Sequence, residues 1–187
     1  SVGDSSFDAW IKFYRPDENS PNAVVSYYAK GSLVAAALDL TLRRTGRASL
    51  DGVLRTLWER YGRSGVGVPE GAIERIVAEI AGEQMHDFFA RYVHGTDDPP
   101  LAALLDAFGV DYSLRPAASA ADRGGKPASA PAPACWLGAS VAKDLTLQNV
   151  FTGSPAERAG LAARDVLVAI DGVRASADSL DKLATTR

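Results

Sequence analysis

The sequence predicts a multidomain protein of mixed α and β structure, with an all-α helical module followed by a small β-rich module. Over residues 1–115, apolar side chains recur at three- and four-residue steps, which is the period of an α-helix. In residues 135–187 they form short runs bounded by Gly, Pro and Asp, which is typical of strands. Residues 116–134 are rich in Ala, Pro, Ser and Gly and contain no large apolar side chain, so they are predicted to be a linker.

Composition and charge exclude several classes of function. The 187 residues are 47% hydrophobic and 23% charged, which is ordinary globular composition. The net charge of −3 gives no basic field that would attract nucleic acid. The longest strongly apolar run, residues 33–38, is far shorter than the ~20 residues that span a bilayer, so no membrane partner is expected. Cys135 is the only cysteine, so no internal disulfide forms; one thiol is compatible with the cytoplasm but does not fix the compartment.

The helical module is expected to open with a short amphipathic helix, "FDAWIKFY", capped by Ser6 and ended by a proline. After a polar loop, a long helix is predicted to start at Ser20-Pro21 or at Asn22 and to run to about Arg44. Because its apolar side chains cover most of its circumference, it is predicted to be buried. Further helices are predicted at residues 49–62, 69–82, 85–95 and 99–109, and a strand at residues 110–116.

The β-rich module contains a short helix with a complete set of start signals. Ser154 is placed to cap it, Pro155 occupies its first position, and Glu157 can complete a capping box. The Asp171-Gly172 pair predicts a tight hairpin turn after the helix. The predicted strands are "CWLGASVA", "LTLQNVF" and "DVLVAI".

As a whole, the string "VFTGSPAERAGLAARDVLVAIDGVRA" closely resembles a bacterial PDZ domain. Such domains bind the C-terminus of a peptide, which adds a strand to an open sheet edge while a backbone loop holds its carboxylate. The resemblance places that loop in "WLGA", on Leu137, Gly138 and Ala139, and the second wall of the groove in "ADSLDKLATT". The family's final strands have no counterpart in the chain, which implies a partial PDZ domain. The alternative that the loop only turns the chain stays open.

Two longer strings carry a second resemblance. "YRPDENSPNAVVSYYAKGSLVAAALDLTLRR" and "DFFARYVHGTDDPPLAALLDAFGVDYSLRP" resemble the C-terminal part of the glycyl aminopeptidase family. Members of this family are zinc metallopeptidases in which a PDZ domain follows a thermolysin-like catalytic domain. The resemblance implies that the helical module is the C-terminal portion of such a domain, in a bacterial hydrolase that removes N-terminal glycine, with alanine as a further candidate.

The same resemblance gives the long helix a chemical role. Related zinc aminopeptidases carry a Tyr-x-Lys-Gly element whose tyrosine hydroxyl donates to the oxyanion of the tetrahedral intermediate. Alignment on Lys30 and Gly31 places this tyrosine at Tyr28, with Tyr27 as the alternative, and Gly31 is expected to leave room for a close neighbouring wall. Helical spacing alone favours instead a core tyrosine whose hydroxyl reaches the surface.

The metal ligands of the family are not found in this sequence. Its zinc motif, His-Glu-x-x-His, places two ligands one helical turn apart with a glutamate as general base. The only histidines here, His86 and His94, are about two turns apart, too far to chelate one ion from a straight helix, and Asp87 does not complete the pattern. Cys135 has no nearby histidine that would activate it as a nucleophile. Zinc is therefore expected in an intact parent enzyme, with none bound by this chain.

The sequence begins with Ser1 and its only methionine is Met85, so we expect a piece of a larger protein. The preferred interpretation is part of a zinc aminopeptidase that is inactive alone, with peptides as the parent's substrates and a peptide C-terminus at the PDZ groove. The alternative is a non-catalytic adaptor with a helical platform and a peptide-binding PDZ domain. If the helical module is separated from its catalytic half, its uncovered apolar faces are expected to cause self-association.

Overall fold

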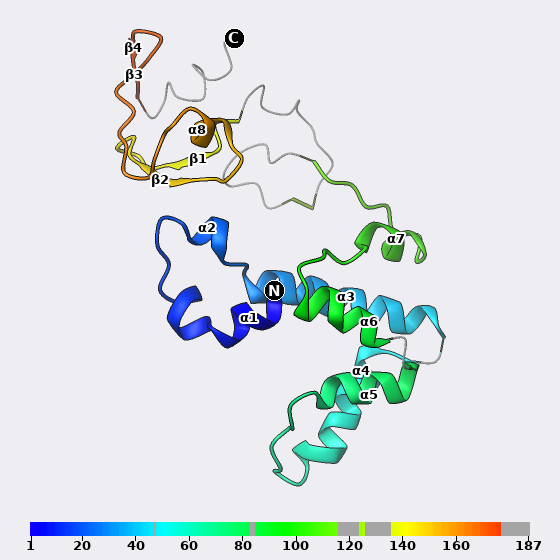
Figure 1. The fold of residues 1–187 in the computed structure, drawn as a ribbon. Coiled ribbons are helices and arrows are strands. Elements are labelled where there is room, and N and C mark those ends of the chain that lie inside the picture. Colours follow the sequence, from blue (N-terminus) through cyan, green and yellow to red (C-terminus); the bar gives the residue numbers. More distant parts are fainter. Residues whose placement is uncertain (47, 83–84, 116–123, 126–135, 177–187) are drawn as a thin grey trace. The chain divides into compact units, whose positions relative to one another are not determined.

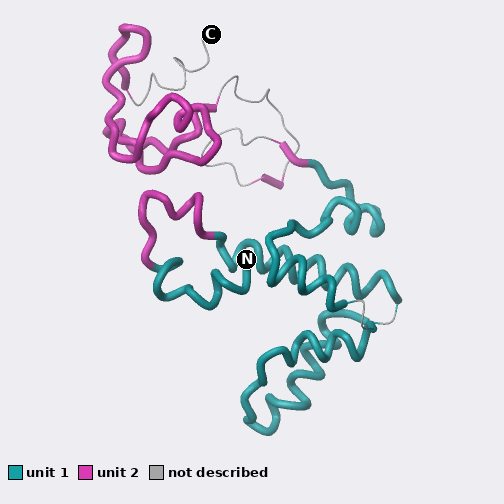
Figure 2. Tube along the Cα trace, viewed as in Figure 1, with its two compact units in different colours: residues 1–14, 25–113 teal, residues 15–24, 114–187 magenta. Residues whose placement is uncertain are grey.

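The computed structural model describes residues 1–46, 48–82, 85–115, 124–125 and 136–176. The chain divides into two compact units (Figure 2). Unit 1 consists of residues 1–14 and 25–113, and unit 2 of residues 15–24 and 114–187. Unit 2 is thus discontinuous in sequence, because residues 15–24 join the segment that follows residue 113. The domain limits expected from composition stay a prediction, since most of the linker lies outside the described residues.

The described secondary-structure elements of unit 1 are helical, as the sequence predicts (Figure 1). The strand predicted over residues 110–116 is wrong: residues 110–115 are irregular, because no strand in the described part of unit 1 offers them backbone partners. The elements of unit 1 are α1 (Val2–Phe7), the π-helical turn η1 (Ala9–Phe13), α3 (Tyr27–Arg44), α4 (Leu50–Leu57), η2 (Trp58–Gly62), α5 (Ala72–Ala81), α6 (Met85–Phe89), η3 (Ala90–His94) and α7 (Leu101–Asp106).

Helix α3 forms the centre of the hydrophobic core of unit 1. Its buried side chains recur at three- and four-residue steps on one face, and the other helices pack against that face. The opposite face is open, since Ser32, Ala36 and Arg43 are exposed, and Leu33 and Tyr28 at its edges are exposed as well. The prediction that α3 is buried on most sides is therefore wrong. The buried core residues are Val34, Ala37, Leu38, Leu42, Val53, Ile76, Val77, Met85, Phe88, Phe89, Tyr92 and Leu104.

The start of α3 follows from a cap that the sequence analysis passed over. Ser26 has an extended backbone, and its side chain accepts a hydrogen bond from the Ala29 amide at 3.2 Å. The predicted starts at Ser20 and Asn22 are therefore wrong. Those two residues form a separate one-turn helix in unit 2, α2 (Ser20–Ala23), after which the chain is extended up to the cap.

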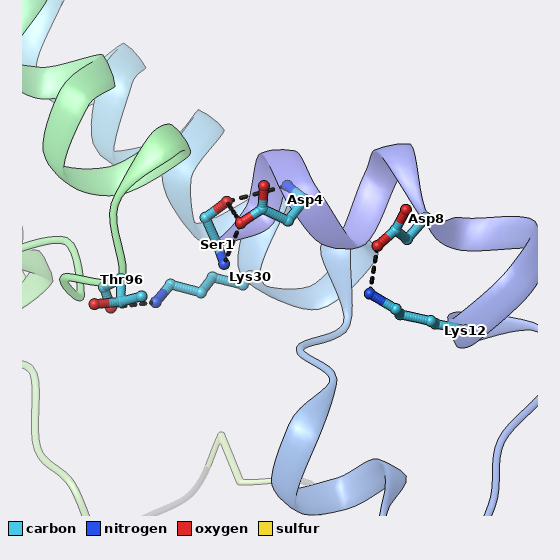
Figure 3. A network of polar contacts seen from close by, with 6 residues as sticks. All are labelled: Ser1, Asp4, Asp8, Lys12, Lys30 and Thr96. Atoms are coloured by element: carbon cyan, nitrogen blue, oxygen red, sulfur yellow. Dashed lines mark hydrogen bonds and ion pairs between the residues drawn. The ribbon is translucent and has the colours of Figure 1, made fainter.

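The first helix also starts earlier than predicted. Ser1 is the cap of α1: its Oγ accepts from the Asp4 amide at 3.0 Å and donates to the Asp4 carboxylate at 2.7 Å (Figure 3). Ser6, the predicted cap, lies inside α1. The helical path then continues through η1 to Tyr14, so the predicted amphipathic stretch forms the second part of a longer element.

Unit 2 contains two antiparallel strand pairs and a short helix. Strand β1 (Ala139–Val141) pairs with β2 (Leu147–Val150), and β3 (Ala169–Ile170) pairs with β4 (Val173–Arg174). The Asp171-Gly172 turn is confirmed, with φ values of 53° and 78° at its two residues, as a type I′ turn requires. The cap of α8 (Pro155–Arg158) is also confirmed, because the Ser154 side chain accepts from the Glu157 amide at 3.1 Å.

Buried side chains are fewer in unit 2. Leu147 on β2, Ala156 on α8 and the capping Ser154 are buried almost completely and form its centre. Among the helices that the structure describes, none combines the length and the apolar character needed to cross a membrane.

Candidate active-site tyrosines and the peptide-binding loop

Three tyrosines of unit 1 meet through their hydroxyl groups, and we refer to Tyr14, Tyr27 and Tyr28 as the tyrosine cluster. The Tyr14 hydroxyl lies 2.9 Å from that of Tyr27 and 2.7 Å from that of Tyr28. Tyr14 stands at the end of η1, and the other two occupy the first turn of α3 directly after its Ser26 cap. The structure thus brings both candidate donors of the Tyr-x-Lys-Gly element together with a third tyrosine that the sequence analysis did not consider.

Aromatic packing supports the cluster. The rings of Tyr27 and Tyr28 stack with their centroids 4.3 Å apart. Phe13 meets the Tyr27 ring edge to face at 5.1 Å, and Trp10 lies 5.1 Å from the Tyr14 ring. The Tyr28 side chain is nevertheless 60% exposed, so it is not the core tyrosine that helical spacing alone favours.

The three hydroxyls are not equivalent electrostatically. The hydrogen bond with Tyr14 lowers the pKa of Tyr28 and raises the pKa of Tyr27. In each pair either oxygen can be the donor, so the two contacts fix the distances between the hydroxyls and not the direction of donation. A phenol with a lowered pKa is the stronger hydrogen-bond donor, which favours Tyr28 over Tyr27 as a donor to a group outside the cluster.

Lys30 anchors the same turn of α3. Its ammonium group donates to the Thr96 carbonyl at 3.0 Å (Figure 3). The same group pairs with the Asp98 carboxylate at 2.9 Å, and the Lys30 side chain is only 16% exposed. The lysine of the Tyr-x-Lys-Gly element therefore fixes the loop after η3. A Cβ added to Gly31 would lie 3.9 Å from Val2, an ordinary contact, so the described packing does not itself require a glycine there.

The predicted carboxylate-binding loop forms a tight turn in unit 2. Gly138 is buried with φ at 79°, and a Cβ there would lie 2.1 Å from the Ser154 Cβ, so only glycine fits. The Leu137 carbonyl accepts from the Ala156 amide at 3.0 Å, and the Gly138 carbonyl accepts from the Phe151 amide at 2.9 Å. The loop of Leu137, Gly138 and Ala139 is thus held against both α8 and the end of β2.

The strand that follows this loop is β1. β2 pairs with β1 on one side, and on the other it exchanges backbone hydrogen bonds with residues 164 and 165. Among the described strands, β1 pairs only with β2. The predicted second wall of the groove, residues 177–186, lies outside the described residues.

The histidines do not assemble a metal centre within the part of the chain that is described. His94 Nε2 lies 2.7 Å from the Glu74 carboxylate and forms a pair with it. Over the described ranges, no three His, Cys, Asp or Glu side chains come close enough to hold a metal ion. These residues therefore do not fit a zinc ion, and no chemical step is assigned to a metal held by them.

Comparison with known proteins gives three findings. Residues 1–34 match the family model of the M61 glycyl aminopeptidases, and residues 149–185 match that of the PDZ domain. The chain is also similar to the crystal structure of an aminopeptidase N family protein from Idiomarina loihiensis, with 34% identity and a TM-score of 0.86. That match covers 98% of this chain and 32% of the other, so the chain spans about a third of that protein's length. No curated protein matches. The chain is therefore similar to peptidase-family proteins, with a glycyl aminopeptidase match at its start and a PDZ domain match after it.

Proposed function

We propose that this chain is the part of a zinc aminopeptidase that completes its active site, and that the intact enzyme hydrolyses N-terminal glycine, with alanine as a further candidate, from peptides. The family match of residues 1–34 and the similarity to an aminopeptidase N family protein support this proposal. Because the described residues do not fit a zinc ion, the metal ligands and the general base would come from the part of the enzyme outside this chain. The chain alone would be inactive.

The observation that carries the proposal is the tyrosine cluster. When a peptide bond is attacked, negative charge develops on its carbonyl oxygen, and a donor already placed beside that oxygen stabilises the transition state. Tyr28 has the required properties, because its side chain is exposed and its hydrogen bond with Tyr14 lowers the pKa of the hydroxyl, which makes it a better donor. Tyr27 is less suited, since its hydrogen bond with Tyr14 raises the pKa of its hydroxyl.

Unit 2 is proposed to bind a peptide C-terminus. The backbone amides of the loop formed by Leu137, Gly138 and Ala139 would hold the carboxylate, and the peptide would pair with β1. The PDZ domain match supports this role, and among the described strands β1 pairs only with β2.

The test of the catalytic role is a pair of tyrosine variants in the enzyme that contains this chain. Tyr28→Phe is expected to lower kcat for a chromogenic glycyl amide by about 10²–10³-fold, with KM little changed, because only the transition state uses the donor. Tyr27→Phe is the matched control and is expected to change kcat far less. Equal kcat values in Tyr28→Phe and the unaltered enzyme would remove the proposed role.

The adaptor interpretation makes the opposite prediction. A non-catalytic platform with a PDZ domain would bind a peptide C-terminus but show no hydrolysis to lose. The DNA that encodes the regions around this segment distinguishes the peptidase from the adaptor, since the peptidase requires a His-Glu-x-x-His element outside the chain.

A further inference from the structure

We propose that Asn22 is a positioning residue that links the Leu137–Ala139 loop of unit 2 to the tyrosine cluster. The catalytic role of the tyrosine cluster rests on the proposed function, but the link itself does not. The coupling itself is a property of this chain and can be measured on it.

Asn22 uses both ends of its side-chain amide on the backbone of unit 2. Its Nδ2 donates to the Val150 carbonyl at 2.8 Å, and its Oδ1 accepts from the Thr152 amide at 3.0 Å. One side chain therefore satisfies a carbonyl and an amide two positions apart, much as a neighbouring strand would do. These contacts lie entirely within unit 2, to which residues 15–24 belong.

The residues held by Asn22 are the direct partners of the predicted carboxylate loop. Val150 lies opposite Ala139 in the β1–β2 register. Phe151, which lies between the two residues that Asn22 contacts, donates its amide to the Gly138 carbonyl at 2.9 Å. A displacement of the loop would therefore reach Asn22 through one step of backbone hydrogen bonding.

A second contact holds the same segment. The Asn149 side chain donates to the Glu18 carbonyl at 3.0 Å, and the Glu18 carboxylate forms an exposed ion pair with Arg164 at 3.2 Å. The exposed ion pair adds little by itself, but the two side-chain-to-backbone contacts fix the segment at two positions. The last residues of β2 thus hold residues 15–24 at both Glu18 and Asn22.

These outward contacts are not needed to form the turn. The turn is already closed by local hydrogen bonds, in which the Asp17 amide donates to the Ser20 hydroxyl at 2.7 Å and the Asn19 amide donates to the Asp17 carboxylate at 3.0 Å. Asn22 also donates from Nδ2 to Asn19 Oδ1 at 3.1 Å within the turn, and its contacts with Val150 and Thr152 add a connection between the turn and the end of β2.

Residues of the tyrosine cluster lie close to both ends of this segment along the chain. Tyr14 precedes residue 15, and Tyr27 and Tyr28 follow shortly after residue 24. The Tyr14 hydroxyl contacts those of Tyr27 and Tyr28, and the held segment joins the same residues along the chain, so the position of this segment affects how the hydroxyls meet. A change at the carboxylate loop would thus alter the hydroxyl contacts of the tyrosine cluster.

The experiment uses the whole chain with ¹³C-labelled tyrosine rings. In Asn22→Ala, amide exchange at Thr152 is expected to rise by about 2- to 10-fold, the effect of losing one hydrogen bond, and the ring signals of the tyrosine cluster are expected to shift. Gln148→Ala is the matched control, because this neighbouring exposed residue of β2 has no hydrogen bond from its side chain to the described residues. It should change neither measurement.

A second substitution tests the direction of the coupling. Trp136 precedes the carboxylate loop, and its ring stacks on Phe151 with centroids 6.3 Å apart, while the side chain is largely exposed. Trp136→Ala is expected to shift the ring signals of the tyrosine cluster in the unaltered chain but not in the Asn22→Ala chain, as a double-mutant cycle for a coupled pair requires.

Two results would overturn the link. One is an Asn22→Ala chain in which Thr152 exchange rises while the tyrosine signals stay in place. The other is a Trp136→Ala shift of equal size with and without Asn22. If the alanine variant does not fold, Asn22→Asp serves instead, because it keeps the acceptor for Thr152 and loses the donor to Val150. Unchanged kcat in Tyr28→Phe would remove the catalytic role of the cluster and leave this link standing.

Discussion

At the scale of single residues, Tyr14 affects its two neighbours in the cluster in opposite ways. The hydrogen bond with Tyr14 lowers the pKa of Tyr28 and raises the pKa of Tyr27. Two adjacent residues on one helix thereby acquire opposite properties from the same third hydroxyl. Neither the sequence nor the helix geometry distinguishes them.

Removal of that third hydroxyl tests the assignment. In Tyr14→Phe the pKa of Tyr28 is expected to rise towards its ordinary value, because its phenolate loses a donor, and the pKa of Tyr27 is expected to fall, because its neutral form loses an acceptor. NMR titration of the ring carbons measures both. Tyr112→Phe, which removes a hydroxyl outside the cluster, is the control, and a shift of both tyrosines in the same direction would contradict the assignment.

Gly138 carries a second prediction at this scale. Gly138→Ala is expected to destabilise unit 2 by about 3 kcal/mol or more, since it combines a left-handed backbone with a Cβ 2.1 Å from that of Ser154. Gly153→Ala is the matched control: its φ is 73°, but its Cβ would meet nothing within 4 Å, so it carries only the backbone cost of about 1–2 kcal/mol. Chemical denaturation compares the two, and equal losses would show that contact with Ser154 is unimportant.

At the scale of elements, periodicity predicted which segments are helical but not where the helices begin. Apolar residues of α3 recur at three- and four-residue steps because they pack against several helices. This recurrence is visible in the sequence. Its start depends on the backbone at Ser26, and the sequence offered Ser20 and Asn22 as equally good caps. Asn22 instead bonds to β2, far away along the chain, and no local pattern reveals such a partner. Tyr14 was missed for the same reason, since η1 and α3 meet only in the folded unit.

A substitution at Gly31 tests whether the described contacts account for all of the packing at this position of α3. Gly31→Ala is expected to stabilise unit 1 by about 0.5–1 kcal/mol, because a helical glycine costs backbone entropy and the added Cβ meets only Val2 at 3.9 Å. Gly95→Ala is the contrasting variant, since its Cβ would lie 2.6 Å from the Arg91 carbonyl oxygen and should destabilise by about 1–3 kcal/mol. Thermal unfolding of both variants gives the sign. Destabilisation by Gly31→Ala would show that packing beyond Val2 limits this position.

At the scale of the whole molecule, the first two elements expose large apolar side chains. Phe7, Trp10 and Ile11 are spaced as residues on one helical face are, and Phe7 and Trp10 are 91% and 79% exposed. Exposed aromatic groups at this density mark a surface that another protein surface covers. This surface is the expected source of self-association when the chain is studied alone.

Sedimentation measures that expectation. The chain is expected to associate as its concentration rises, and Phe7→Ser with Trp10→Ser is expected to restore a monomer, because both substitutions remove exposed apolar area. Val68→Ser, an exposed apolar residue on a loop outside these elements, is the control and should leave association unchanged. A strictly monomeric unaltered chain at high concentration would contradict the prediction.

The discontinuity of unit 2 has a consequence for how such proteins are cut and recombined. A gene segment that began at Cys135 would encode the PDZ match without Glu18 and Asn22, and the end of β2 would lose the partners that these residues provide. A single crossover within residues 116–134 would likewise join one protein's β2 to another protein's residues 15–24. The two stretches therefore have to be inherited together, although most of the chain separates them, and a PDZ module exchanged between relatives would have to bring its own copy of the loop.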